Sequence, residues 1–233
     1  MKKINFCSIG ECMIEIANTN NNHFIQSFAG DTLNFSAYLD KKKIKVDYLT
    51  SIGKSKINKN LFDIFKLKKI SPKLVNIHKD KESGLYLIKN YKNGEKRFYY
   101  WRDNSAAKDY LNNLNYNKLI SKFTKYDYIY FSGITLALFS KEKRMNFYEF
   151  IKILKQKNIK IVFDLNIRLN RWLNILQLNK TLNLFPFALP INVKFVLIAN
   201  STPQDVKPER DIKIGIFILT VLITISLVNL PVV

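Results

Sequence analysis

The sequence predicts an α/β protein with a mainly parallel central sheet, helices flanking it and a small antiparallel accessory sheet. Short apolar runs that fit buried strands alternate with longer, lysine-rich segments of helical period over about the first 172 residues. Three strand-like runs follow one another near the N-terminus. The pair Asn93-Gly94 lies between two runs of strand character, which is a strong hairpin signal.

The N-terminal elements set up the first βαβ-like unit. Strands are expected at residues 4–9, 13–17 and 24–28, and their close succession indicates a meander. A helix is expected from Asp31 or Thr32 to about Lys42. A strand at residues 46–52 then ends in Gly53.

The elements that follow extend the sheet and add the hairpin. A helix is expected at about residues 59–69 and a strand at 74–78. The hairpin strands are expected at residues 84–90 and 96–102. Two buried strands, residues 128–131 and 160–164, are separated by a Lys- and Glu-rich helix over about 141–157.

The character of the chain changes after Trp172. The expected organisation is therefore an α/β part over residues 1–172 and a divergent tail over 173–233. Residues 214–233 carry no charge and are long enough to cross a bilayer. A buried helix, a strand pair and an unfolded tail remain alternatives, since the segment is rich in β-branched residues.

Charge and cysteine content exclude several classes of protein. The formal net charge is +20, but the excess is nearly all lysine dispersed along the chain, so no nucleic-acid partner is expected. Cys7 and Cys12 have no companions at metal-ligand spacing, so no metal site is expected and buried free thiols are. The N-terminus has too short an apolar stretch for a secretory signal, which indicates the cytoplasm.

The first segment with chemical character runs from Gly30 to Asn34. Asp31 and Asn34 share a face at a helix start, where a carboxylate and an amide can grip two neighbouring hydroxyls of a polyol. The alternative is that Asp31 only caps the helix.

The second segment is the hairpin, with Tyr86 on one strand and Tyr100, Trp101 and Arg102 on the other. Period-two spacing puts Tyr100 and Arg102 on one face. An aromatic wall beside a guanidinium suits an anionic, hydroxylated small molecule. An ordinary half-buried hairpin with a surface cation is the alternative.

The third segment follows an apolar strand with Asp164, Asn166 and Arg168. Ligand sites in α/β sheets lie at the carboxyl ends of strands. Arg168 would contact a carboxylate or a phosphate, while Asp164 would cap the following turn in the alternative interpretation.

Together these segments resemble the carbohydrate kinases of the ribokinase (PfkB) family, and within it the kinases of 2-keto-3-deoxygluconate. The matching stretches occur in family order over about residues 1–172: Ser8-Ile9-Gly10-Glu11, Phe28-Ala29-Gly30-Asp31-Thr32-Leu33-Asn34, Gly84-Leu85-Tyr86, Tyr100-Trp101-Arg102-Asp103-Asn104-Ser105-Ala106-Ala107, Phe131-Ser132-Gly133-Ile134-Thr135-Leu136-Ala137 and Phe163-Asp164-Leu165-Asn166-Ile167-Arg168.

The resemblance implies a ribokinase-like fold with a small β lid over about residues 10–30 and 84–103, and transfer of the γ-phosphate of ATP, with Mg²⁺, to the 6-hydroxyl of the sugar acid. It implies sugar-acid contacts from Gly30, Asp31, Thr32, Leu33, Asn34, Tyr86, Tyr100, Trp101, Arg102 and Arg168. It implies nucleotide contacts from Asn166, Ile167 and Arg168. Lids of this kind often pair, which implies a homo-oligomer.

The sequence departs from the family at Leu165, where proline is common, and in its last third. The resemblance implies a later Gly-Ala-Gly-Asp type loop carrying the catalytic Asp, but the only glycine after Gly133 is Gly215, inside the apolar run. No catalytic residue is therefore assigned. Turnover is expected to be impaired, because the C-terminal part that would carry the catalytic loop is truncated or replaced. The alternatives are an inactive truncated or frameshifted remnant, a non-catalytic sugar-acid binding module, and a membrane-tethered form held by residues 214–233.

Overall fold

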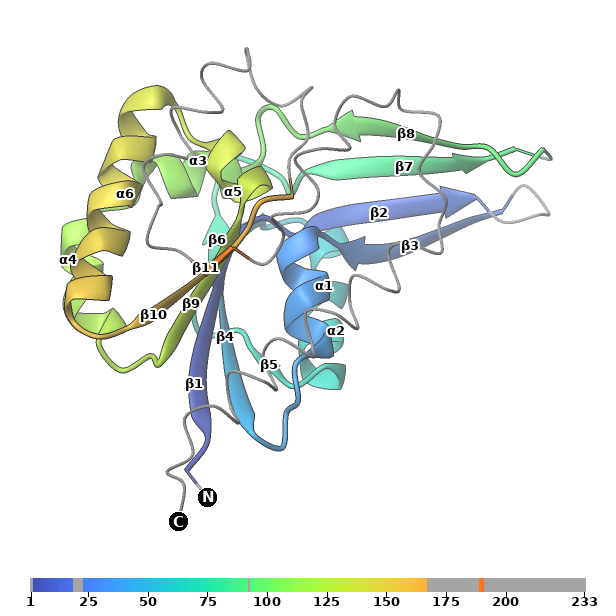
Figure 1. Ribbon diagram of the computed structural model, residues 1–233. Helices are drawn as coiled ribbons and strands as arrows, with labels where there is room; N and C mark the ends of the chain where they lie inside the picture. The colour runs from blue at the N-terminus through green and yellow to red at the C-terminus, as the bar shows by residue number, and fades with distance from the viewer. Residues whose placement is uncertain (1, 19–22, 92, 167–188, 191–233) are drawn as a thin grey trace.

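The structure is a computed structural model, which describes residues 2–18, 23–91, 93–166 and 189–190, and it confirms the α/β class (Figure 1). All strand pairs of the central sheet are parallel, in the order β11-β10-β9-β1-β4-β5, and β6 pairs with the later part of β4. These strands are β1 (Ile4–Ile9), β4 (Ile44–Gly53), β5 (Ile70–Ser71), β6 (Val75–His78), β9 (Tyr128–Ser132), β10 (Lys160–Asp164) and β11 (Leu189–Pro190).

A second sheet of four strands projects from one side of the central sheet (Figure 1) and is called the lid here. Its order is β3-β2-β7-β8, and it comprises β2 (Met13–Asn18), β3 (Phe24–Ala29), β7 (Leu85–Asn90) and β8 (Lys96–Trp101). The predicted hairpin at Asn93-Gly94 is confirmed, because β7 and β8 pair antiparallel and Gly94 has a φ of 82°. Gly94 therefore takes a left-handed turn conformation that suits glycine.

The predicted N-terminal meander is wrong. β1 pairs with β4 and β9 in the central sheet, whereas β2 pairs with β3 and β7 in the lid. The last four residues of β1 are all buried, as in a central parallel strand covered on both faces, whereas most of β2 is only half-buried. The chain leaves the central sheet between these two strands, at residues 10–12.

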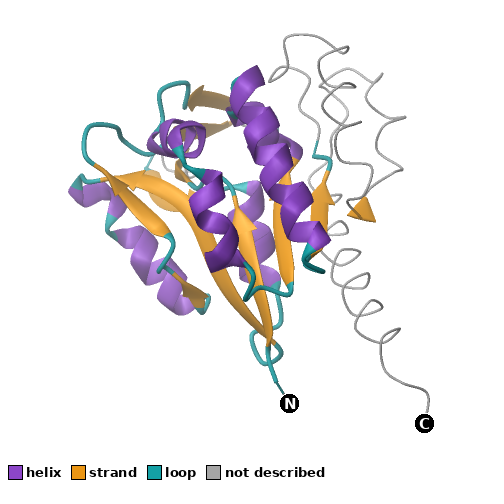
Figure 2. Ribbon diagram, turned by 90° about the vertical axis from the view of Figure 1, so that its left-hand side faces the viewer, coloured by secondary structure: helices purple, strands orange, loops and turns teal. Residues whose placement is uncertain are grey.

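Helices cover both faces of the central sheet (Figures 1 and 2). On one face α1 (Asp31–Tyr38) and α2 (Asn60–Leu67) pack in one core cluster with β1 and β4. On the other face a larger aromatic cluster holds α3 (Ala106–Asn113), α4 (Tyr116–Phe123) and α6 (Lys141–Gln156). The short helices η1 (Lys56–Asn58) and α5 (Gly133–Leu138) complete the set in the described residues.

Most expected elements are present, with two kinds of difference. Helix α1 ends at Tyr38 instead of about Lys42, because Leu39 is extended and the chain turns at Asp40 into β4. Helices α3, α4 and α5 and strand β5 were not expected. The first two are short and polar, but each has a readable cap, in which Ser105 accepts from the Lys108 N–H and Asn115 from the Lys118 N–H.

Aromatic stacking fixes helix α1 on the sheet. The ring of Phe35 stacks on Tyr130 of β9 with a centroid distance of 3.9 Å, and on Phe6 of β1 at 5.9 Å. The helix starts close to the β1–β2 connection, since a Cβ on Gly30 would come within 2.6 Å of the Glu11 carbonyl oxygen. Only glycine lets the backbone approach so closely, and this contact sets where Asp31 lies.

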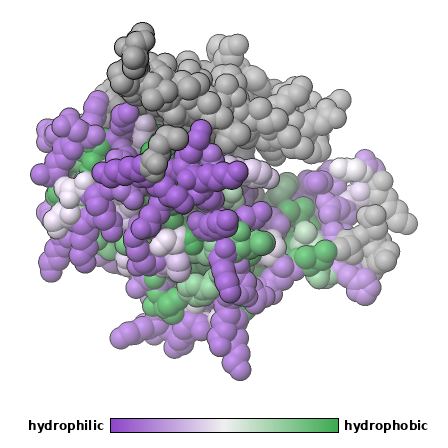
Figure 3. All heavy atoms as spheres, turned by 90° about the horizontal axis from the view of Figure 1, so that it is seen from below, coloured by the Kyte–Doolittle hydropathy of each residue, from purple (hydrophilic) through white to green (hydrophobic). Residues whose placement is uncertain are grey.

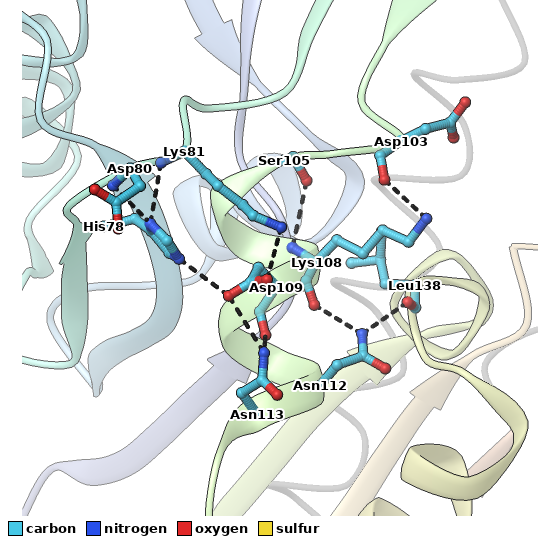
Figure 4. Close-up of polar contacts among 10 residues, drawn as sticks. All are labelled: His78, Asp80, Lys81, Asp103, Ser105, Lys108, Asp109, Asn112, Asn113 and Leu138. Atoms are coloured by element: carbon cyan, nitrogen blue, oxygen red, sulfur yellow. Dashed lines mark hydrogen bonds and ion pairs between the residues drawn. The ribbon is translucent and has the colours of Figure 1, made fainter.

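Polar clusters tie the segments that lead into the lid to the central domain. Glu82, just before β7, accepts from the Asn58 amide at 2.9 Å and from the Ser55 hydroxyl. On the other side Asp109 of α3 pairs with the Lys81 amine at 2.7 Å and with His78 Nε2 at 3.0 Å (Figure 4). His78 Nδ1 accepts from the backbone N–H groups of Asp80 and Lys81, so Nε2 is the ring donor toward Asp109.

Hydrophilic side chains spread over much of the surface, with smaller apolar patches between them (Figure 3). Large exposed apolar residues gather on the two edge strands of the lid, as Phe24 and Ile25 on β3 and residues 98–101 on β8. Within the described ranges no helix has the length and apolarity to cross a membrane. The apolar run 214–233 lies outside these ranges, so its predicted membrane role stays a prediction.

Removing the Asp109 carboxylate tests the cluster on the α3 side. The lysine first, and the histidine second, lower the pKa of Asp109, so its stabilising effect is present above the ordinary Asp pKa and fades as pH falls through the lowered one. We expect Asp109→Asn to lower the free energy of unfolding by about 1 kcal/mol at pH 7. Urea denaturation at several pH values measures this.

The control is Asp80→Asn, which makes the same charge change at an exposed position in the β6–β7 connection, next to Lys81. A loss for Asp109→Asn that is no larger than for Asp80→Asn, or that persists undiminished at pH 3, would contradict this account of the cluster.

Candidate functional site

The described sequence-predicted residues lie in two places. Gly30 to Asn34 and Asn166 lie at the carboxyl edge of the central sheet, whereas Tyr86, Tyr100 and Trp101 lie on the lid and Arg102 at its base. Strand β1 lies between β4 and β9. After β1 the chain adds strands first on the β4 side of the sheet and then on the β9 side. A crevice opens at such a switch point, outside the carboxyl ends of the strands. Gly10, Gly133 and Asn166 follow the ends of β1, β9 and β10 at this edge.

The start of α1 presents two of its polar residues outward and buries two others. Asp31 is half-buried and Asn34 is exposed, one turn apart on the same helix face. Thr32 is fully buried and its hydroxyl bonds the Tyr48 hydroxyl at 2.6 Å, while Leu33 packs in the core. Thr32 and Leu33 can therefore offer a ligand only backbone groups in this arrangement.

The first and third segments meet through one hydrogen bond. Asn166 Nδ2 donates to Asp31 Oδ2 at 3.0 Å, across 135 residues of sequence. Asn166 has a φ of 26°, a left-handed conformation that costs energy for a residue other than glycine and occurs often at binding sites. Ile167 and Arg168 lie outside the described residues, so their predicted contacts stay predictions.

The second segment forms a row of side chains across one face of the lid. In register, Ser27 of β3, Glu15 of β2, Tyr86 of β7 and Tyr100 of β8 lie side by side. The Ser27 hydroxyl donates to Glu15 at 3.3 Å, the Tyr86 hydroxyl donates to the same carboxylate, and the two tyrosine rings are 5.8 Å apart. This lid row is an aromatic wall with one carboxylate in it.

Trp101 and Arg102 separate at the end of β8. Trp101 is 60% exposed and pairs with Leu85, so it lies on the face of the lid opposite to Tyr100. Arg102 is only 6% exposed, and its guanidinium forms an ion pair with Glu11, which is 3% exposed. Arg102 is thus a buried cation at the base of the lid and not a surface charge.

Glu11 and Glu15 are site residues that the sequence interpretation did not single out. Glu11 belongs to the quoted stretch Ser8-Ile9-Gly10-Glu11, but no role was assigned to it. The available signal was a carboxylate directly after a glycine at the carboxyl end of the first strand, where ligand sites form. Glu15 could have been found from strand period, because it alternates with Ile14 and Ile16.

Burial keeps the hydroxyl groups of this region neutral. Desolvation first, and the Glu15 carboxylate second, raise the pKa of Tyr86, and desolvation followed by Asp164 and Asp31 raises the pKa of Tyr130. Burial, helped by Glu11, raises the pKa of Cys12 to about 12. The two tyrosine hydroxyls and the Cys12 thiol therefore stay protonated, and none of them is a nucleophile or base near pH 7.

The arrangement has the chemistry of a binding site for a small hydroxylated acid. Asp31 and Asn34 can hold hydroxyl groups, the lid row can cover an apolar edge, and Arg102 can take a carboxylate. Among the described residues no group of three His, Cys, Asp or Glu side chains could hold a metal ion. A separate polar pocket of about 170 Å³ runs along α3 between Lys81 and Asn112 (Figure 4), and it does not include Asp31, Tyr86 or Tyr100.

Comparison with known proteins gives relatives of one kind. A 2-dehydro-3-deoxygluconokinase of Haemophilus influenzae is 37% identical over 176 residues, which cover 74% of this chain and 55% of the relative. The enzyme of the same name from Escherichia coli K12 is 32% identical, over 70% of this chain and 54% of the relative. The chain spans about half the length of the curated relatives it matches.

Solved structures show the same fold at lower identity. A PfkB family carbohydrate kinase of Listeria grayi superposes with a TM-score of 0.66 at 18% identity, covering 77% of this chain and 57% of that one. The 2-dehydro-3-deoxygluconokinase of Thermotoga maritima gives 0.62 at 18% identity, with 72% and 53% covered. A fructokinase of Xylella fastidiosa with bound ATP gives 0.65 at 17% identity, with 78% and 59% covered.

The family profile described as "pfkB family carbohydrate kinase" matches residues 3–196. The match extends past Trp172, where the composition of the chain changes, and strand β11 pairs with β10 within this range. With its fold, its site at the carboxyl edge and this match over most of its length, the chain belongs to the PfkB family of carbohydrate kinases.

Proposed function

We propose that this chain carries the sugar-acid half of a PfkB kinase and binds 2-keto-3-deoxygluconate or a close 2-keto-3-deoxy sugar acid. The single observation that carries the proposal is the buried guanidinium of Arg102 at the base of the lid, beside the aromatic lid row. Glu11 meets this guanidinium with only one oxygen, which leaves room for a ligand carboxylate, whereas a neutral sugar has no group that suits it. The names of the relatives from Haemophilus influenzae and Escherichia coli point to the same substrate class.

In this proposal each element contributes one kind of contact. Arg102 receives the carboxylate, and Asp31 and Asn34 hold the hydroxyl groups along the sugar chain. Tyr86 and Tyr100 cover the carbon backbone of the sugar and exclude water from it. Gly30 brings the start of α1 close enough for its backbone to take part, and Trp101 contributes from the lid edge.

By its membership of the family, the proposed reaction is phosphoryl transfer, with ATP as donor and the 6-hydroxyl of the sugar acid as acceptor. Asn166, Ile167 and Arg168 would border the nucleotide. Mg²⁺ is inferred from ATP chemistry, in which the ion bridges the phosphates. The 233 residues contain no Gly-Ala-Gly-Asp type loop to hold the developing charge and to take the proton of the attacking hydroxyl. We therefore propose a binding function without normal turnover for these residues alone.

Substitution of Arg102 tests the carboxylate contact. Arg102→Lys keeps a positive charge but loses the fork that binds a carboxylate with two hydrogen bonds. We expect the variant to bind 2-keto-3-deoxygluconate at least about tenfold more weakly, a loss of about 1.4 kcal/mol. Isothermal titration calorimetry measures this.

The control for that variant is Arg97→Lys, an exposed position on the same strand that pairs with Glu95 and lies over the Tyr91 ring. If Arg102→Lys and the unmodified protein bind the sugar acid with equal affinity, Arg102 does not contact its carboxylate.

An ATP-coupled assay tests the proposal about turnover. With ATP, Mg²⁺ and 2-keto-3-deoxygluconate we expect ADP formation no faster than the background without protein, although calorimetry detects binding of the sugar acid. The physical reason is the missing anion-binding loop and its base. ADP formation that depends on the sugar acid would show that these residues hold a base and an anion site elsewhere. No binding and no turnover would favour the inactive remnant.

The lid edges test the proposed homo-oligomer. Phe24 is 61% exposed on edge strand β3, and an apolar strand edge of this kind favours pairing. We expect light scattering to give about twice the chain mass of 27.3 kDa. Phe24→Asp should restore the single-chain mass, whereas Tyr38→Ser, at an exposed site on α1 away from the lid, should not. A single-chain mass for the unmodified protein would contradict lid pairing.

A further inference from the structure

Glu11 lies where all four segments that join the lid to the central domain meet. It is itself part of the connection from β1 to β2, and its carbonyl oxygen lies against Gly30, which leads from β3 into α1. Its carboxylate lies against Gly84 at the entry to β7, where a Cβ would come within 2.7 Å of Oε1. The same carboxylate contacts Arg102 and Ser105, which lead from β8 into α3.

The two carboxylate oxygens of Glu11 have different partners. Ser105 Oγ donates to Oε1, and Arg102 Nη2 pairs with Oε2. Because Ser105 holds one oxygen, Glu11 meets the guanidinium with a single oxygen. The bidentate arrangement that makes arginine–carboxylate pairs strong is not formed.

The guanidinium of Arg102 correspondingly has buried donors whose hydrogen-bonding capacity is unused. Its Nε and Nη2 are both buried without a hydrogen-bond partner among the described residues, although Nη2 lies against Glu11 Oε2 as an ion pair. Nε and Nη2 point to the same side of the guanidinium, so they form the edge that a carboxylate can bind with both oxygens. A buried donor without a partner is costly, which points to an acceptor that arrives from outside.

Glu11 also cancels the charge of Arg102 while the site is empty. An arginine buried without a counter-ion would be strongly destabilising, and it would attract any small anion. With Glu11 in place, a ligand binds Arg102 favourably only if it makes more hydrogen bonds to the guanidinium than Glu11 does. A planar carboxylate that takes both Nε and Nη2 meets that condition, whereas chloride and a neutral sugar do not.

We infer that Glu11 is a specificity-determining residue that competes with the ligand carboxylate for Arg102. The ligand displaces Glu11 from the guanidinium, so the empty site stays closed to simple anions and to neutral sugars. This inference rests on the proposed function, since it takes the ligand to be a sugar acid.

The variant Glu11→Gln tests the competition. The amide keeps an acceptor for Arg102 and a donor for the Ser105 hydroxyl, but the competing charge is gone. Calorimetry should show 2-keto-3-deoxygluconate binding at least about tenfold tighter than to the unmodified protein. Fructose, a 2-keto sugar of the same length without the carboxylate, should bind the variant no tighter than it binds the unmodified protein. Added chloride should weaken sugar-acid binding to the variant more than to the unmodified protein.

The matched control is Glu82→Gln, which removes a carboxylate from another lid connection that contacts Ser55 and Asn58 and no arginine. It should leave sugar-acid affinity unchanged. If Glu11 only supported the segments that join the lid to the central domain, altering it would weaken sugar-acid binding. Equal or weaker sugar-acid binding by Glu11→Gln therefore overturns the inference.

A second measurement needs no change at Glu11 and covers the case in which the variant does not fold. The Nε–H signal of Arg102 in a ¹⁵N spectrum, assigned by its loss in Arg102→Lys, should shift and exchange more slowly with solvent when 2-keto-3-deoxygluconate binds. Fructose should leave it unchanged. If the unmodified protein binds the sugar acid but this signal stays unchanged, the inference is wrong while the proposed function stands. If the unmodified protein does not bind the sugar acid, the proposed function fails.

Discussion

The buried ion pair between Glu11 and Arg102 is the contact on which the rest of the site depends. Two sheets with different strand directions are joined by four crossing segments, and each of them touches Glu11. Glycine at positions 30 and 84 lets these segments approach Glu11 closely, Gly30 at its backbone carbonyl oxygen and Gly84 at its carboxylate. The lid therefore meets the central sheet around a charged centre, which also lies at the edge where α/β proteins bind ligands.

The rest of the site is built outward from this centre. Phe35 and Tyr130 stack to hold α1, which brings Asp31 to the sheet edge and to Asn166. The register of the lid strands puts Tyr86 beside Tyr100 over the same region. In the proposed function, the contacts to the sugar acid come from described residues before position 167 and from Arg168, which lies outside the described residues. In the same proposal, transfer of phosphate needs an anion-binding loop in addition to these contacts.

Patterns local in sequence predicted the elements well and the long-range contacts poorly. The hairpin at Asn93-Gly94 followed from turn chemistry, and strands β1 and β10 have the expected bounds. The meander failed because strand period does not tell which sheet a strand joins. Burial of Arg102 could not be read from β8, since its partner Glu11 lies on another connection far back in the sequence. Ser105, 94 residues from Glu11, is equally remote. Helices α3 and α4 were missed because each is only eight residues long, although their caps were readable.

A crystal structure of the protein with 2-keto-3-deoxygluconate tests the central claim most directly. The account predicts the carboxylate of the sugar acid on Nε and Nη2 of Arg102, with Glu11 turned away toward Ser105 and the lid row over the carbon chain. A bound sugar acid that leaves the Glu11–Arg102 pair intact, or that lies away from the lid, would contradict it.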